Sequence, residues 1–135
     1  YKECDIISLP RPLLDSTRHF VNAETIARMK DGVTIINCAR GELMNIPAMI
    51  RGIETQKIGA LALDVFDKED GIYHENRRDD IISNRDMAYL RQFPNVIMTQ
   101  HMAFYTDAAV QSMVFCGIEG LCDFAKTGHT ATELV

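Results

Sequence analysis

Short apolar runs alternate along most of the chain with stretches of helical periodicity. Four runs have the length and the β-branched composition of strands, and they cover residues 4–9, 33–38, 58–65 and 95–99. The second run is almost uniformly apolar, which is typical of a strand covered on both faces. Pro10 and Pro12 end the first run, because proline cannot donate a hydrogen bond to a neighbouring strand.

Helical patterns fill the intervals between these strands. Asn22 and Asn45 are placed to cap helices over residues 23–30 and 46–56, because an asparagine side chain accepts hydrogen bonds from the first amides of a helix. Gly32 follows the first helix, where a left-handed helix end costs little. A further helix is expected near residues 84–92. Apolar residues recur at helical spacing in a last one, at Val110, Met113, Val114, Gly117, Ile118 and Leu121.

Strands that alternate with helices of roughly 10–15 residues predict βαβ units. The expected fold is therefore α/β, with a parallel sheet of four main strands, helices on both faces, and residues 66–94 as an excursion outside the sheet. Ligands of such sheets bind beyond the carboxyl ends of the strands. The residues just past each strand are the candidates for a site, and among them are Arg11, Arg40, Asp64, Asp67, Glu69 and His101.

Composition narrows the class of protein. The 135 residues are 47% hydrophobic and 24% charged, which suits one globular domain. The scattered net charge of −5 argues against a nucleic-acid-binding protein, which needs a basic face. No apolar run approaches the roughly 20 residues of a membrane span. The four cysteines form no Cys-x-x-Cys pair and lie in apolar stretches, so we expect reduced, buried thiols in a cytoplasmic protein.

Several short sequence motifs lie in or near the predicted strands and match the order and spacing of a known family. They are DIISL at 5–9, MKDG at 29–32, INCARGEL at 36–43, LDVF at 63–66, PNV at 94–96 and TQHMAFYT at 99–106. In this order and spacing the chain resembles the D-isomer-specific 2-hydroxyacid dehydrogenases, most closely the D-lactate dehydrogenase branch. The resemblance implies the second half of a Rossmann-type dinucleotide-binding domain, NAD as cofactor, a 2-oxo or 2-hydroxy acid as substrate, no metal, and a homodimer in the full-length enzyme.

Three side chains in these segments match the family's catalytic set. Arg40 matches the arginine that binds the substrate, and a guanidinium grips a carboxylate through two parallel hydrogen bonds. His101 matches the proton donor to the substrate carbonyl. Glu69 matches the acid that orients this histidine, and Asp67, in the same acidic run, is the competing candidate.

Other positions match the family's contacts with the cofactor. They are Arg11, Pro12, Thr17, Cys38, Ala39, Arg40 and Asp64. The first three match a loop on the adenosine and phosphate side, and Asp64 matches an aspartate beside the nicotinamide. We interpret Cys38 as a small buried residue, because no second residue of the site activates it as a nucleophile.

The chain also departs from the family pattern. A His is usual at Pro10 and a Pro at Gln100, and the eight glycines contain no Gly-x-Gly-x-x-Gly turn for a pyrophosphate. We therefore expect a C-terminal part of a longer enzyme, inactive by itself, without the phosphate-binding half and the substrate domain. The alternative is a non-catalytic binding or oligomerisation module that retains the half-domain.

Overall fold

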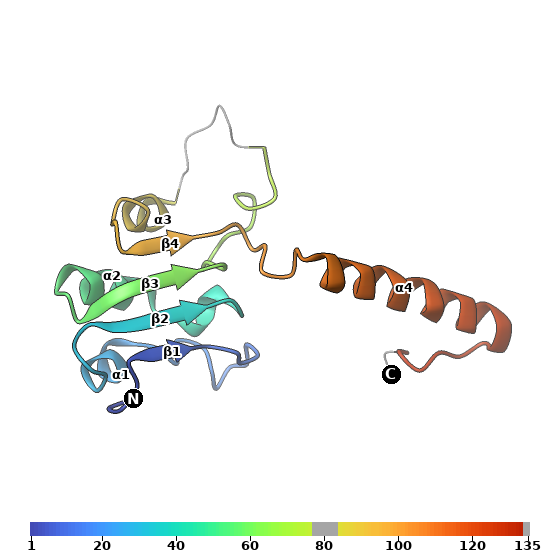
Figure 1. Cartoon of the computed structure of the whole chain (residues 1–135), viewed down its shortest axis with the longest axis horizontal. Coiled ribbons are helices and arrows are strands. Elements are labelled where there is room, and N and C mark those ends of the chain that lie inside the picture. The colour runs from blue at the N-terminus through green and yellow to red at the C-terminus, as the bar shows by residue number, and fades with distance from the viewer. Residues whose placement is uncertain (77–83, 134–135) are drawn as a thin grey trace. The chain divides into compact units, whose positions relative to one another are not determined.

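The computed structural model describes residues 1–76 and 84–133, which form two compact units, Tyr1–His101 and Met102–Val135 (Figure 1). The elements of the first unit are β1 (Ile6–Ser8), α1 (Ala23–Ala27), β2 (Val33–Asn37), the 3₁₀ helix η1 (Gly41–Leu43), α2 (Ile46–Glu54), β3 (Ile58–Leu63), α3 (Arg85–Leu90) and β4 (Val96–Met98). The second unit contains α4 (Asp107–Thr127). The predicted excursion at 66–94 includes residues 77–83, which lie outside the described residues.

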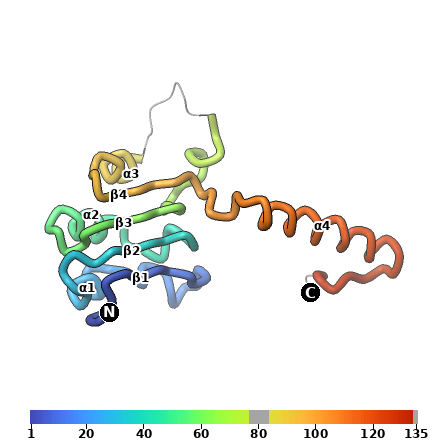
Figure 2. Tube along the Cα trace, in the orientation of Figure 1, coloured from blue at the N-terminus to red at the C-terminus, as the bar shows by residue number. Residues whose placement is uncertain are grey.

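The four strands form one parallel sheet in the order β1-β2-β3-β4, and their arrows point the same way in Figure 1. Across the sheet, Ile7 lies opposite Ile35, Ile35 opposite Leu61, and Leu61 opposite Val96. Figure 2 shows the strands side by side along the Cα trace. The predicted α/β fold with a parallel sheet is confirmed, and the carboxyl ends of all four strands therefore meet at one edge.

The helices begin where the sequence predicts, at capping asparagines. Asn22 accepts hydrogen bonds from the amides of Glu24 and Thr25, and the hydroxyl of Thr25 accepts one from the Asn22 amide in return. The side chain of Asn45 accepts from the Ala48 amide at 3.0 Å, and Asn84 caps α3 in the same way. Both α1 and α2 end two or three residues earlier than predicted.

The core lies between the sheet and the layer formed by α1, α2 and α3. Residues 33, 35 and 37 of β2 are buried, whereas residues 34 and 36 between them are only partly so. Consecutive right-handed crossovers to the next strand in order place all three helices on the same face. On the opposite face Ile6 and Ile97 are 64% and 66% exposed, so the described helices of residues 1–101 lie on one face of the sheet, where the sequence predicts helices on both.

The helix α4 is capped at its start by Thr106, whose hydroxyl accepts from the Ala109 amide, and at its end by Gly128, with φ of 74°. None of its residues is buried, and its apolar side chains are exposed. By length and composition alone it is long and apolar enough to cross a membrane, with a mean hydropathy of 1.2. The sequence analysis missed this because polar residues interrupt the apolar run. One such helix is weak evidence of a membrane span.

The expectation of buried thiols is wrong, because all four cysteines are free and exposed. Cys38 follows Asn37, which takes the last inward position of β2, so the alternation of the strand leaves Cys38 outside the core. Cys4 precedes β1, and Cys116 and Cys122 lie on the exposed helix α4. The interpretation of Cys38 as a buried residue is therefore corrected.

The burial pattern of the sheet predicts unequal effects of two equivalent truncations. Ile35 is fully buried, so Ile35→Ala should lower the free energy of unfolding by about 2–5 kcal/mol. Ile97→Ala, on the exposed face, should change it by no more than about 0.5 kcal/mol. Urea unfolding of both variants measures the difference. Equal losses would show that the open face of the sheet is covered in solution.

Candidate active site

The turn after β2 is built by a buried asparagine. The side chain of Asn37 is inaccessible to solvent; its amide group donates to the carbonyl of Arg40 at 2.8 Å, and its oxygen accepts from the Ala39 amide at 3.0 Å. These two bonds hold the backbone from Cys38 to Arg40 in one conformation. The sequence analysis missed this role, although a polar residue at the inward end of an apolar strand signals a buried hydrogen-bond requirement.

Arg40 extends from this turn to the surface. Its Nη1 donates to the carbonyl of Ala39 at 2.7 Å, and the residue is exposed. A guanidinium has five N–H donors, so an arginine bound in this way keeps donors for an anion. The residue is thus placed at the carboxyl edge of the sheet, as predicted.

Asp64 joins the ends of three strands. Its amide donates to the carbonyl of Asn37 at 2.9 Å, and its own carbonyl accepts from the His101 amide at 2.6 Å. The hydroxyl of Thr99 donates to its carboxylate, which belongs to a residue only 3% exposed. The loop that carries the histidine is therefore tied to β3, and β3 to β2, at the edge where the predicted site lies.

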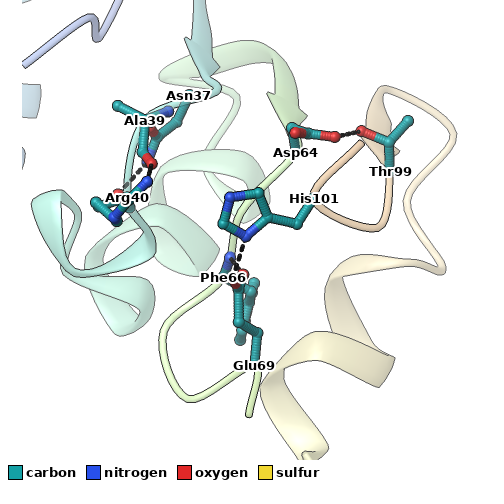
Figure 3. A network of polar contacts seen from close by, with 8 residues as sticks. All are labelled: Asn37, Ala39, Arg40, Asp64, Phe66, Glu69, Thr99 and His101. Atoms are coloured by element: carbon teal, nitrogen blue, oxygen red, sulfur yellow. Dashed lines mark hydrogen bonds and ion pairs between the residues drawn. The ribbon is translucent and has the colours of Figure 1, made fainter. Parts of the chain in front are cut away.

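Glu69 and His101 form the central pair of the site (Figure 3). Oε1 of Glu69 lies 2.5 Å from Nδ1 of His101, and Oε2 accepts from the Phe66 amide at 2.6 Å. An ionised carboxylate can only accept hydrogen bonds, so Nδ1 of His101 carries the proton in this contact. The other ring nitrogen, Nε2, faces the site. The carboxylate contact is made by Glu69, as predicted, rather than by its competitor Asp67.

The backbone of His101 is held in an unusual conformation. His101 has φ of 54°, a left-handed conformation that costs a residue with a side chain about 1–3 kcal/mol. Its bond to the Asp64 carbonyl stabilises this conformation. In the preceding loop the Glu69 carbonyl accepts from the amides of Ile72 and Tyr73, at 2.9 and 3.1 Å, which closes a turn around the glutamate.

Tyr73 anchors this loop in the core. Its residue is 8% exposed, and burial, followed by the nearby charge of Glu69, raises the pKa of its hydroxyl to about 12. Both effects disfavour the phenolate, because it would be a second negative charge in a poorly solvated position. Near neutral pH the Tyr73 side chain is therefore uncharged, and its burial stabilises the folded loop.

The loop after β1 is a separate local structure. The Thr17 hydroxyl donates to the Pro12 carbonyl at 2.9 Å and accepts from the Leu14 amide at 2.8 Å, which buries Thr17. The guanidinium of Arg11 lies 5.1 Å from the centre of the Phe20 ring. These residues follow β1 and so share the carboxyl edge with the catalytic candidates, while the contacts described above stay within their own loop.

Comparison with known proteins assigns the chain to a family. Residues 1–103 match the family model described as D-isomer specific 2-hydroxyacid dehydrogenase, NAD binding domain. The chain therefore belongs to the D-isomer-specific 2-hydroxyacid dehydrogenases, a family whose cofactor is NAD. The resemblance seen in the sequence is confirmed.

Individual relatives agree with this assignment. An aromatic 2-oxoacid reductase of Clostridium sporogenes is 45% identical over all 135 residues, and the chain covers 41% of it. A D-lactate dehydrogenase of Lactobacillus delbrueckii subsp. bulgaricus is 42% identical over 84% of the chain and 34% of the relative. The chain thus spans about two fifths of the length of the first of these relatives.

Solved structures show the same fold. A D-lactate dehydrogenase from Lactobacillus jensenii with NAD⁺ superimposes with a TM-score of 0.89 and 34% identity, over 99% of this chain and 40% of that one. A D-lactate dehydrogenase from Sporolactobacillus gives a TM-score of 0.92 and 32% identity, over 96% and 39%. The first match includes nearly all of α4, so the segment has a counterpart in a D-lactate dehydrogenase.

The residues at the sheet edge fit one end of the family's cofactor. A nicotinamide carries a carboxamide, and two acceptors lie at the edge that bears the Glu69–His101 pair: the Asp64 carboxylate, which accepts from the Thr99 hydroxyl, and the Ala39 carbonyl, which accepts from Nη1 of Arg40. A pyrophosphate needs a glycine-rich turn before a helix, and the sequence contains none. The fit is therefore to the nicotinamide end.

The raised pKa of Tyr73 predicts a loss of stability at high pH. An unfolded tyrosine ionises near its ordinary value of 10.0, whereas the folded one stays neutral to about 12. The contribution of Tyr73 is therefore complete below pH 10 and lost as the pH rises through 12. Tyr73→Phe should reduce the fall in the free energy of unfolding over this range, and Tyr105→Phe, whose residue is 67% exposed, should not. Identical profiles for both variants would contradict the assignment.

Proposed function

We propose that this chain forms the nicotinamide-side half of the active site of an NAD-dependent dehydrogenase that interconverts a 2-oxo acid and a D-2-hydroxy acid. The observation that carries the proposal is the Glu69–His101 pair, joined at 2.5 Å, on the sheet edge that also bears Arg40. In domain terms the chain is the C-terminal part of the NAD-binding domain.

Each member of the set has one task in the proposed reaction. The Arg40 guanidinium binds the substrate carboxylate through paired hydrogen bonds, which fixes the orientation of the adjacent carbonyl. His101 donates the proton on Nε2 to the carbonyl oxygen, and in the reverse direction it accepts the proton from the hydroxyl. When bound, the reduced nicotinamide supplies the hydride that goes to the 2-carbon. Hydride and proton together convert the carbonyl into a hydroxyl.

Glu69 makes this proton transfer possible without touching the substrate. Its carboxylate accepts the Nδ1 proton, which fixes the orientation of the ring. While His101 is protonated, the carboxylate balances the positive charge. Figure 3 shows the other ring nitrogen on the side of the turn that carries Ala39 and Arg40. This arrangement supports an imidazole that transfers its proton toward a substrate held by the arginine.

We assign the remaining edge residues to the cofactor. Asp64 and the backbone of Cys38 and Ala39 contact the nicotinamide end. The loop of Arg11, Pro12 and Thr17 contacts the adenosine and phosphate side. The hydrogen bonds of Thr17 support this, because they fix the conformation of the loop at the carboxyl edge of β1.

The relatives indicate the class of substrate, a 2-oxo acid, and we propose two candidates within it. D-lactate dehydrogenases among the relatives favour pyruvate, whereas the aromatic 2-oxoacid reductase, 45% identical, favours an aromatic 2-oxo acid. The complete enzyme, assayed with NADH against pyruvate and phenylpyruvate, separates the two. The alternative of a non-catalytic assembly module has no use for the Glu69–His101 pair together with Arg40.

We also propose that the complete enzyme is a soluble, cytoplasmic homodimer. The four free cysteines support a reducing compartment, in which thiols stay unpaired. A mass measurement in solution tests the oligomeric state.

Substitutions in the complete enzyme should separate substrate binding from proton transfer. His101→Asn should lower kcat by about 10²–10⁴-fold, the usual contribution of a general acid. Arg40→Lys keeps the charge and loses the paired geometry, so it should raise the KM for the 2-oxo acid. Arg28→Ala, at the far end of α1, is the matched control and should leave both constants unchanged. Near-normal 2-oxo acid reduction by His101→Asn would remove the proton-donor assignment.

The 135-residue chain alone should be inactive. Hydride transfer requires cofactor and substrate in a fixed geometry, and a misplacement of about 1 Å costs up to 10²-fold. The chain lacks a glycine-rich pyrophosphate turn, so it should neither bind NADH tightly nor reduce pyruvate measurably. NADH fluorescence titration and a coupled absorbance assay measure both. Robust turnover would show that the nicotinamide-side residues suffice.

A further inference from the structure

Gly41, directly after the predicted substrate arginine, occupies a place where no other residue fits. A Cβ built on Gly41 would lie closer than 3.0 Å to the carbonyl carbon and oxygen of Phe66 and to the nitrogen of Asp67. All three atoms are backbone, so no side-chain rotation relieves the clash. The φ of Gly41 is not in the left-handed region, so the requirement for glycine is one of space.

This close approach joins two loops that follow different strands. Gly41 begins η1 after β2, whereas Phe66 and Asp67 follow β3. The Phe66 amide is the group that donates to Oε2 of Glu69, at 2.6 Å, and Oε1 of the same carboxylate contacts His101. The clashing carbonyl and the donating amide both belong to Phe66, so a displacement of this residue is transmitted through one carboxylate to the imidazole.

The two sides of the contact are not equally free to move. On the Gly41 side, Arg40 is held by Asn37, and Leu43 is 2% exposed. On the other side Phe66 is also buried, at 3% exposed, but the chain leaves the core directly after it: Asp67 is partly exposed and Lys68 is exposed, with φ of 59°. A Cβ at residue 41 should accordingly displace the loop of Phe66 and Asp67 and leave the arginine turn in place.

We propose that Gly41 is a positioning residue for the Glu69–His101 pair, and that its missing side chain sets the distance between the turn of Arg40 and the loop that carries Phe66 and Glu69. The proposal rests on the proposed function for its catalytic meaning, but the positioning itself is a property of this chain. Gly41 acts through the backbone of Phe66, and the proposal gives it no contact with substrate or cofactor.

The test compares two glycines with the same kind of clash. A Cβ at Gly59 would also lie closer than 3.0 Å to backbone, at the carbonyl of Gly32 by the amino end of β3. Gly41→Ala and Gly59→Ala should therefore both destabilise the chain, and only the first should disturb the site. The readout is the strongly downfield proton resonance of the His101 Nδ1–H, which a hydrogen bond to a carboxylate produces. Its loss in Glu69→Gln identifies it.

We expect the Nδ1–H resonance to disappear or move upfield in folded Gly41→Ala and to persist in Gly59→Ala. Persistence of the wild-type resonance in Gly41→Ala overturns the proposal. Loss in both variants does so as well, because it would show a general effect of destabilisation. This measurement needs no catalysis, so it stays valid if the complete protein has no dehydrogenase activity.

If Gly41→Ala does not fold in the 135-residue chain, the same pair is compared in the complete enzyme. There kcat, normalised to the native fraction, should fall by about tenfold or more in Gly41→Ala, because a small misplacement of a catalytic group has large effects. The KM for the 2-oxo acid should change less, since Arg40 stays in place. A kcat equal to that of Gly59→Ala overturns the proposal.

Discussion

Both oxygens of the Glu69 carboxylate are bound, one by the imidazole of His101 and the other by the Phe66 amide, and the candidate site depends on this double contact. A carboxylate that is hydrogen-bonded at one oxygen can rotate about its terminal C–C bond. When both oxygens are hydrogen-bonded, this rotation is restricted and the direction of each oxygen is fixed. Because the second contact is made by backbone, the orientation of the imidazole is set by the course of the chain after β3. The left-handed backbone of His101 is held against the same strand, through the carbonyl of Asp64.

The parallel sheet converts this local arrangement into a site. Arg40 follows β2, Glu69 follows β3 and His101 follows β4, and neighbouring parallel strands end at the same edge. Asn37, Asp64 and the peptide at Phe66 then tie the three loops to one another. The arginine proposed to bind the anion and the histidine proposed to donate the proton thus lie on one hydrogen-bonded frame, as the proposed reduction of a 2-oxo acid requires.

Much of this was predictable from the sequence, for identifiable reasons. The caps at Asn22 and Asn45 are local chemistry, and the shared edge of Arg40, Glu69 and His101 follows from strand order alone. The role of Asn37 was not predicted because the residue continues an apolar strand. The burial of Cys38 was predicted wrongly because that strand was extended by one residue. The space requirement at Gly41 depends on Phe66 and Asp67, distant in sequence, so only the folded chain reveals it.

The central claim is that Arg40 and His101 act on one 2-oxo acid. A crystal structure of the complete enzyme with NADH and oxamate, an unreactive analogue of such an acid, measures this directly. We expect the oxamate carboxylate in paired hydrogen bonds with the Arg40 guanidinium and its carbonyl oxygen within about 3 Å of Nε2 of His101. Oxamate bound away from this edge, or a His101 turned so that Nε2 meets no substrate oxygen, would contradict it.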